Sequence, residues 1–185
     1  KELMLVIEDV KTKKEKRFLM GMGMSGNWVF IEKGNVPKHS HIIFESLSGG
    51  KLCMYDVRRF SRWKESNGWS DNRGPCMLTE WDDFVDNLHN NSHKKIFDKP
   101  IYELMLDQKY FNGMGNYLRA EILDRADQDP FVSSREAIKN KKMLSLCDTV
   151  VEEAYQLGGG QLSQWMNPYF DDKLTFREWM RCYTK

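Results

Sequence analysis

The sequence predicts an α+β fold, because the periodicity of its apolar residues changes along the chain. In the first third, short apolar runs are separated by turn formers such as Gly49-Gly50, as in β-strands. Farther along, apolar residues recur at helical spacing. Between these regions lies a segment rich in Ser, Asn and Gly. We therefore expect two domains, a β-sandwich over residues 1–63 and a helical domain over 77–185, joined by a linker over 64–76.

Five strands are expected in the first domain. Several carry apolar residues at both alternating positions, as strands that are buried on two faces do. They are ELMLVIEDV from Glu2, KRFLMGMGMSG from Lys16, NWVFIEK from Asn27, HIIFESL from His41 and KLCMYDV from Lys51.

Helices are expected at intervals in the second domain. Thr79 is an expected N-cap for LTEWDDFVDNLHNN, whose apolar face consists of Trp81, Phe84, Val85 and Leu88. Pro100 can open the next helix, since its missing N–H would have no partner there anyway. A later helix is expected from about Lys142 to Leu157, and a short last one in TFREWMRCY.

The segment DQKYFNGMGNYLRAEIL, from Asp107 to Leu123, places two glycines directly before a helix. Asn116 is expected to cap that helix, and a buried stripe is formed by Leu118, Ile122 and Ala126. Glycines allow another backbone to approach, and a helix N-terminus offers unpaired N–H groups with partial positive charge. The segment therefore suits an anion. By spacing alone, a sharp connection between two helices explains the glycines equally well.

Composition limits the possible functions. The formal net charge is +1, so any binding to nucleic acid needs basic residues gathered on one face. No cysteine pair has the C-x-x-C spacing, which argues against a zinc site and against a disulfide scaffold. The cysteines are therefore more typical of a protein in a reducing compartment inside the cell. The apolar runs are too short for a membrane span. We expect an intracellular protein without a metal or cofactor; its cysteines are Cys53, Cys76, Cys147 and Cys182.

Several short motifs together resemble one family. In order they are KEL at the start, GMSG at residues 23–26, DVRRF at 56–60, the segment at 107–123 and FREWMRCY near the end. This series resembles the Fpg/Nei family of DNA glycosylases, most of all its animal Nei-like 1 group, and the 107–123 segment is similar to the family's helix-two-turns-helix motif. Residues 133–175 match poorly, and the 158–170 loop departs from the family pattern, which leaves the preferred damaged base open.

The resemblance implies that the glycine turn holds DNA. In the family, the Asn that opens the second helix and the adjacent amides hold the phosphates that flank a damaged nucleotide. The corresponding residues are Gly115, Asn116 and Tyr117. Such contacts position a duplex without reading its sequence.

The resemblance also implies base flipping. The family rotates a damaged base out of the duplex and fills the hole with three side chains, which correspond to Met24, Arg58 and Phe60. Met adapts to an irregular gap, Phe stacks as a wedge, and Arg can hydrogen-bond the orphaned base. By pattern alone, Met24 fits better as a core residue of a strand, and the basic cluster around Arg58 can be a solvated face.

Two further residues are implied in catalysis. Lys1 corresponds to a lysine that reaches the family's active site on a β-turn, where it can donate a proton; an exposed terminal lysine is the strong alternative. Glu121 corresponds to a residue that helps to shape the active-site floor. Because it lies beside the apolar stripe, we expect it to be partly buried with a partner, although a surface carboxylate is about equally consistent with its place.

The family's nucleophile, an N-terminal proline followed by an acidic residue, is not found in this sequence, which begins at Lys1. We therefore expect a truncated sandwich, a nucleophile upstream of Lys1, and poor catalysis by this chain alone. The finger that follows the family's last helix is also missing from it.

The function expected of the whole protein is that of a bifunctional DNA glycosylase and AP lyase of base excision repair. It would act in the nucleus, as a monomer, on double-stranded DNA that carries an oxidised base or an abasic site. The alternatives are a non-catalytic module that binds damaged DNA, and a generic α+β domain without a ligand.

Overall fold

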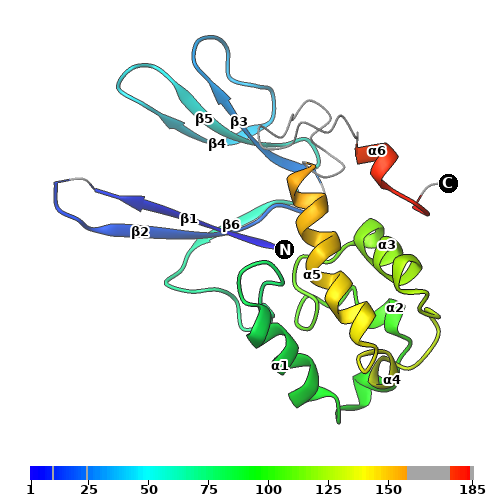
Figure 1. Ribbon diagram of the computed structural model, residues 1–185. Helices are drawn as coiled ribbons and strands as arrows, with labels where there is room; N and C mark the ends of the chain where they lie inside the picture. The colour runs from blue at the N-terminus through cyan, green and yellow to red at the C-terminus, as the bar shows by residue number, and fades with distance from the viewer. Residues whose placement is uncertain (10, 24, 158–175, 184–185) are drawn as a thin grey trace. The chain divides into compact units, whose positions relative to one another are not determined.

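The computed structural model describes residues 1–9, 11–23, 25–157 and 176–183. The chain forms two compact units, Lys1–Asp71 (unit 1) and Asn72–Lys185 (unit 2) (Figure 1). Among the described residues, every strand falls in unit 1 and every helix in unit 2, so the predicted α+β class is confirmed.

Unit 1 consists of two three-stranded antiparallel sheets. The first has the order β1 (Glu2–Glu8), β2 (Glu15–Gly21), β6 (Arg62–Glu65), and the second has the order β3 (Gly26–Ile31), β5 (Lys51–Asp56), β4 (Ser40–Glu45). The five predicted strands are all present. The strand β6 was not predicted, and it starts just before the segment that we expected to be a linker.

The core of unit 1 lies on the central strand of each sheet. Met20 on β2 and Met54 on β5 are each 1% exposed, and Leu19 and Cys53 beside them are also buried. The chain passes between the two sheets at two connections, β2 to β3 and β5 to β6. These two crossings carry the GMSG and DVRRF motifs.

Unit 2 is helical. Its elements are α1 (Trp81–Asn91), the 3-10 helix η1 (Lys95–Asp98), α2 (Ile101–Leu104), α3 (Asn116–Ala126), α4 (Ser134–Ala137), α5 (Lys141–Gln156) and α6 (Phe176–Trp179). Figure 1 shows α3 beside α5, and the two helices pack against each other. Their shared core contains side chains with no exposed surface, including Phe84, Phe97, Phe111, Ile122, Met143 and Cys147.

The helix boundaries correct two predictions in detail and agree with a third. Thr79 does not cap α1, which begins at Trp81 after Glu80; the Glu80 carboxylate instead accepts the N–H of Cys76 at 2.7 Å. Pro100 precedes α2 as its N-cap residue and is not its first helical residue. The predicted long helix agrees with α5 to within one residue at each end.

Within the described parts of the chain, no helix combines the length and the apolar character that crossing a membrane requires.

Candidate nucleic-acid interface

The start of α3 differs from the prediction in one respect. Asn116 is the first residue of the helix and not its cap, because the cap position is taken by Gly115. Gly115 has an extended backbone, with φ of −136°, which any residue can adopt. Gly113 is different: its φ of +90° is a conformation that only glycine adopts readily. Of the two glycines, Gly113 is therefore the one that the backbone of the turn requires.

The N-terminal end of α3 offers unpaired donors. The first helical hydrogen bond runs from the N–H of Arg119 to the carbonyl of Gly115, at 3.0 Å. The N–H groups of residues 116–118 therefore have no acceptor within the helix. Asn116 is exposed, whereas Met114 before it is 1% exposed and anchors the turn. This end of the helix has the donors and the partial positive charge that an anion needs.

A residue that the sequence reasoning missed holds the turn in place. The side chain of Gln108 accepts the N–H of Gly113 at 3.0 Å through Oε1, and its Nε2 donates to the carbonyl of Met114 at 3.1 Å. One amide thus bridges both sides of the glycine turn. Gln108 belongs to the quoted motif, but nothing in its spacing indicates that its side chain folds back onto the turn.

Tyr117 is half-buried. Its ring packs edge-on against Phe176, with the centroids 5.2 Å apart, and against Tyr183, with the centroids 6.4 Å apart. Burial raises the pKa of the Tyr117 hydroxyl. The backbone N–H of Tyr117 has no acceptor within the helix and remains available to a ligand.

Glu121 has no exposed surface, so the alternative of a surface carboxylate is wrong. Its carboxylate accepts three backbone N–H groups, from Arg181 at 2.8 Å, Cys182 at 3.1 Å and Tyr183 at 3.1 Å. Burial raises the pKa of Glu121, but these hydrogen bonds outweigh burial and the pKa lies below its usual value. The ionised carboxylate fixes the chain that follows α6.

An ionic network next to Glu121 joins three helices. The guanidinium of Arg125 lies 2.6 Å from a carboxylate oxygen of Glu153 and 4.6 Å from the centroid of the Trp179 ring. The indole N–H of Trp179 donates to the same Glu153 oxygen at 2.7 Å. Arg125 belongs to α3, Glu153 to α5 and Trp179 to α6, so the network holds α6 against the other two helices.

In unit 1, two of the three predicted wedge residues, Arg58 and Phe60, lie on the loop of residues 57–61 between β5 and β6. Phe60 is 57% exposed, and the guanidinium carbon of Arg58 lies 5.3 Å from the centroid of its ring. Arg62 and Lys64 are exposed on the following strand, as a basic surface requires. Met24 and the loop of residues 158–170 lie outside the described residues. Lys1 is exposed directly before β1, and its catalytic role stays a prediction.

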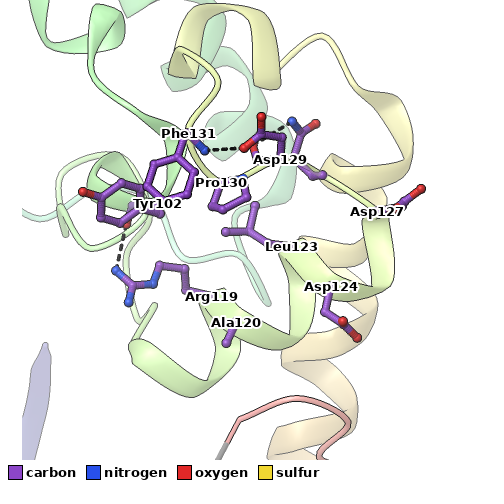
Figure 2. A pocket seen from close by; sticks show the side chains of 10 residues that line it. Tyr102, Arg119, Ala120, Leu123, Asp124, Asp127, Asp129, Pro130 and Phe131 are labelled. Carbon is purple, nitrogen blue, oxygen red and sulfur yellow. Dashed lines mark hydrogen bonds between the residues drawn. The ribbon is translucent and has the colours of Figure 1, made fainter.

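A hollow in unit 2 has the wrong charge for DNA. Figure 2 shows Tyr102, Pro130 and Phe131 gathered on its wall, and the lining also includes Asp124, Asp127 and Asp129. The guanidinium of Arg119, which donates to the carbonyl of Tyr102 at 2.9 Å, is also in the lining and offsets only part of the negative charge of the three carboxylates. The acidic lining would repel phosphate, so the duplex is not expected here.

The described residues do not bring three His, Cys, Asp or Glu side chains together as metal ligands. Burial, followed by the charges of Glu121 and Asp124, raises the pKa of Cys182 to about 11. A thiol that resists ionisation in this way is a poor metal ligand.

Comparison with known proteins identifies the relatives of the chain. Residues 1–63 match the family model described as the formamidopyrimidine-DNA glycosylase N-terminal domain. The chain is 34% identical to endonuclease 8-like 1 of Homo sapiens, in a match that covers 99% of this chain and 54% of the relative. It is 36% identical to the Mus musculus protein of the same name, over 87% of this chain and 47% of the relative. The chain thus spans about half the length of these relatives.

A solved structure has the same fold. The Lactococcus lactis formamidopyrimidine-DNA glycosylase, bound non-covalently to DNA that contains an abasic site, superposes with a TM-score of 0.68 at 20% identity. The match covers 86% of this chain and 63% of that one. This likeness supports the α+β fold, in which β-sheets are followed along the chain by a helical region.

Proposed function

Because this chain belongs to the Fpg/Nei family of DNA glycosylases, we propose that it grips damaged duplex DNA within a base excision repair enzyme. The observation that carries the proposal is the exposed start of α3, where unpaired N–H groups follow a turn that is held rigid by Gln108 and anchored by Met114. The relative from Lactococcus lactis binds DNA with an abasic site. The same class of ligand suits the chemistry found here.

The start of α3 would hold the phosphates beside the damaged nucleotide. The backbone N–H groups of Asn116 and Tyr117 point along the helix axis toward its N-terminal side, where the helix dipole favours negative charge. The Asn116 side chain can add a further donor. Contacts of this kind fix the position of the duplex and carry no information on its sequence.

Side chains of unit 1 would fill the space that the flipped base leaves. When a base is flipped out and its space is left unfilled, the duplex loses a few kcal/mol of stacking free energy. An exposed aromatic ring that enters the space can restore the stacking. Phe60 has this exposure, and Arg58 beside it can hydrogen-bond the unpaired base on the opposite strand. The proposal includes Met24 as the third side chain.

The reaction that we propose for the whole protein is that of a bifunctional glycosylase and lyase acting on oxidised bases. An amine attacks C1′ of the sugar, the C1′–N bond to the base breaks, and the resulting Schiff base allows elimination of the 3′ phosphate. Lys1 would donate a proton near the sugar. Glu121 would act by fixing residues 181–183, since both of its oxygens already accept backbone N–H groups.

The attacking amine is assigned to the longer protein. An N-terminal proline followed by an acidic residue is not found in residues 1–185, and the chain spans about half the length of its relatives. The proposal therefore treats residues 1–63 as the remainder of the catalytic β domain, 64–76 as the linker and 77–185 as the DNA-binding domain. It places the protein in the nucleus as a monomer.

Covalent trapping tests this assignment. The complete gene product and the 185-residue chain would each be incubated with a duplex that contains an abasic site and with borohydride, which reduces a Schiff base to a stable cross-link. We expect a cross-link with the complete protein and little with the chain alone. Equal trapping by both would contradict the assignment of the amine. Tight binding to damaged DNA without trapping by either would favour the alternative, a non-catalytic damage-binding module.

A further inference from the structure

The carboxylate of Asp56 is fully buried at the end of β5, where the chain leaves one sheet of unit 1 for the other. It accepts the N–H of Arg58 at 3.1 Å through Oδ1 and the N–H of Ser61 at 2.7 Å through Oδ2. Both donors belong to the loop of residues 57–61. The loop that carries Arg58 and Phe60 is therefore folded around this one carboxylate.

The same carboxylate also reaches the other crossing between the sheets. The hydroxyl of Ser25, in the turn between β2 and β3, donates to Oδ1 of Asp56. The hydroxyl of Ser61 lies 2.7 Å from Oδ2 and 3.1 Å from the carbonyl oxygen of Met22. Asp56 thus joins the 22–25 turn and the 57–61 loop, which are more than thirty residues apart in the chain.

Two glycines allow the turn and the loop to touch. A Cβ at Gly26 would lie 2.2 Å from the Ser61 hydroxyl oxygen and 2.4 Å from the Met22 carbonyl oxygen, so no side chain fits there. Gly23 has φ of +60°, and a Cβ on it would lie 3.1 Å from the Cβ of Phe60. The turn therefore packs directly against the residue that we expect to enter the duplex.

We propose that Asp56 is a positioning residue for damage recognition, which holds the turn and the loop in one arrangement so that Arg58 and Phe60 enter the duplex together. This inference rests on the proposed function of that loop. A loop that is already ordered loses less conformational entropy when it enters DNA, and so it binds more tightly. The preordering of this loop should matter more for binding to damaged DNA than to undamaged DNA, since the loop enters the duplex only where a base is flipped out or missing.

The chemistry of the site requires a carboxylate. One backbone N–H faces each oxygen of Asp56, and an ionised carboxylate accepts at both. An Asn at this position has the same size, but its NH₂ group would face one of the two N–H donors whichever way the amide is turned. Asp56→Asn is therefore a substitution that releases the loop without removing bulk.

Asp9 provides a matched control in the same unit. It caps the connection between β1 and β2, where Oδ1 alone accepts the N–H groups of Lys11 at 2.9 Å and Thr12 at 2.7 Å. Asn can replace it with both bonds kept. Asp9→Asn is therefore expected to leave DNA binding unchanged.

The experiment measures how strongly the complete gene product prefers a duplex with a stable abasic-site analogue over an undamaged duplex. The affinities of wild type, Asp56→Asn, Phe60→Ala, the double variant and Asp9→Asn would be measured by fluorescence anisotropy, at a temperature where all are folded. We expect Asp56→Asn to lower the preference by about tenfold, nearly as much as Phe60→Ala, with little change on undamaged DNA. The double variant should be worse than Phe60→Ala by much less than about tenfold, since Asp56 acts through Phe60 as well as through Arg58.

Other outcomes separate this inference from the proposed function. If Asp56→Asn weakens binding to both duplexes equally, or adds its full effect to that of Phe60→Ala, Asp56 is merely structural and the inference fails. If Phe60→Ala lowers the preference and Asp56→Asn does not, the inference alone fails. If Phe60→Ala has no effect on the preference, both the proposed function of the loop and the inference are wrong.

If Asp56→Asn does not fold, Ser61→Ala is the substitute variant. It keeps the bond from the backbone N–H of residue 61 to Asp56 and removes the bond from the hydroxyl. An unchanged preference in that variant would also overturn the inference.

Discussion

The backbone N–H of Arg181 lies 2.8 Å from Oε2 of Glu121, a carboxylate without exposed surface. The two residues are sixty positions apart. The helix α3 therefore has two functions in this fold: its first turn faces outward with free donors, and its middle fixes the segment that follows α6. Substitutions in the first turn of α3 should therefore affect ligand binding, and substitutions in its middle should affect stability.

Glu121→Gln should destabilise unit 2. An amide cannot accept the N–H of Arg181 on one side and those of Cys182 and Tyr183 on the other, so its NH₂ group would face at least one backbone donor. Because hydrogen bonds to a charged group contribute about 1.5–3 kcal/mol each, we expect the free energy of unfolding to fall by about 2 kcal/mol. Urea denaturation of the 185-residue chain measures it.

Glu152→Gln is the control for that measurement. Glu152 lies on α5, and its partner is the side chain of Gln156 on the same exposed face. Loss of this contact should change the free energy of unfolding by less than about 0.5 kcal/mol. Equal losses in both variants would mean that the hydrogen bonds at Glu121 contribute nothing specific.

The effect of Glu121→Gln should depend on pH. The pKa of Glu121 is lowered in the folded protein, since three N–H donors outweigh the burial that raises it. A carboxyl group of this kind stabilises the fold fully above its unfolded pKa of 4.5, and loses that contribution as pH falls through the folded value. The difference in unfolding free energy between wild type and Glu121→Gln should therefore shrink below pH 4.5. A difference that stays constant between pH 7 and pH 3 would refute the assignment of an ionised carboxylate.

Periodicity was enough to predict most elements of this fold, because alternation and helical spacing report burial directly. The strand β6 escaped prediction for the same reason: its four residues, Arg62–Glu65, are all exposed and have no apolar pattern. The position of β6 is set by pairing with β2, in which Met20 lies opposite Trp63. Such pairing is a contact between segments far apart in the chain, and it leaves no periodic signal in the strand itself.

The motifs of the candidate site could be predicted from the sequence, but the hydrogen bonds that support them could not. The glycine turn could be found from the sequence, but the sequence could not show that Gly113 has the positive φ while Gly115 is extended. The supports were missed altogether. The side chain of Gln108 contacts the backbone of Met114, six residues farther along the chain. The carboxylate of Asp56 accepts hydrogen bonds from two loops that are distant in the chain. Hydrogen bonds of this kind leave no periodic signal.

Asn116→Asp should change DNA binding and protein stability in opposite directions. A carboxylate in the first turn of α3 interacts favourably with the helix dipole, so the free energy of unfolding should rise by about 0.3–1 kcal/mol. A phosphate at the same place would be repelled, and we expect affinity to fall about tenfold on all sequences, damaged or not. Fluorescence anisotropy and urea denaturation of the complete protein measure the two effects.

Asn140→Asp makes the same chemical change at another helix start. Asn140 caps α5, where its side chain accepts the N–H of Met143 at 3.2 Å, and Asp can accept the same bond. DNA affinity should stay as in the wild type. If Asn140→Asp weakened binding as much as Asn116→Asp, the loss would reflect net charge and not a phosphate site at α3.

Gly74→Ala should disturb the proposed phosphate site at the start of α3 from a distance. A Cβ on Gly74 would lie 2.2 Å from the backbone carbonyl oxygen of Lys109, and Gly74 also donates its N–H to the carbonyl of Gln108 at 3.0 Å. The added methyl group must push the backbone around Gln108, whose side chain holds the glycine turn. We expect a loss of about 1–3 kcal/mol in the free energy of unfolding and weaker DNA binding.

Gly68→Ala is the control, because its Cβ would meet no atom within 4 Å. Equal stability and equal affinity in the two variants would show that the backbone contact at Gly74 does not support the turn.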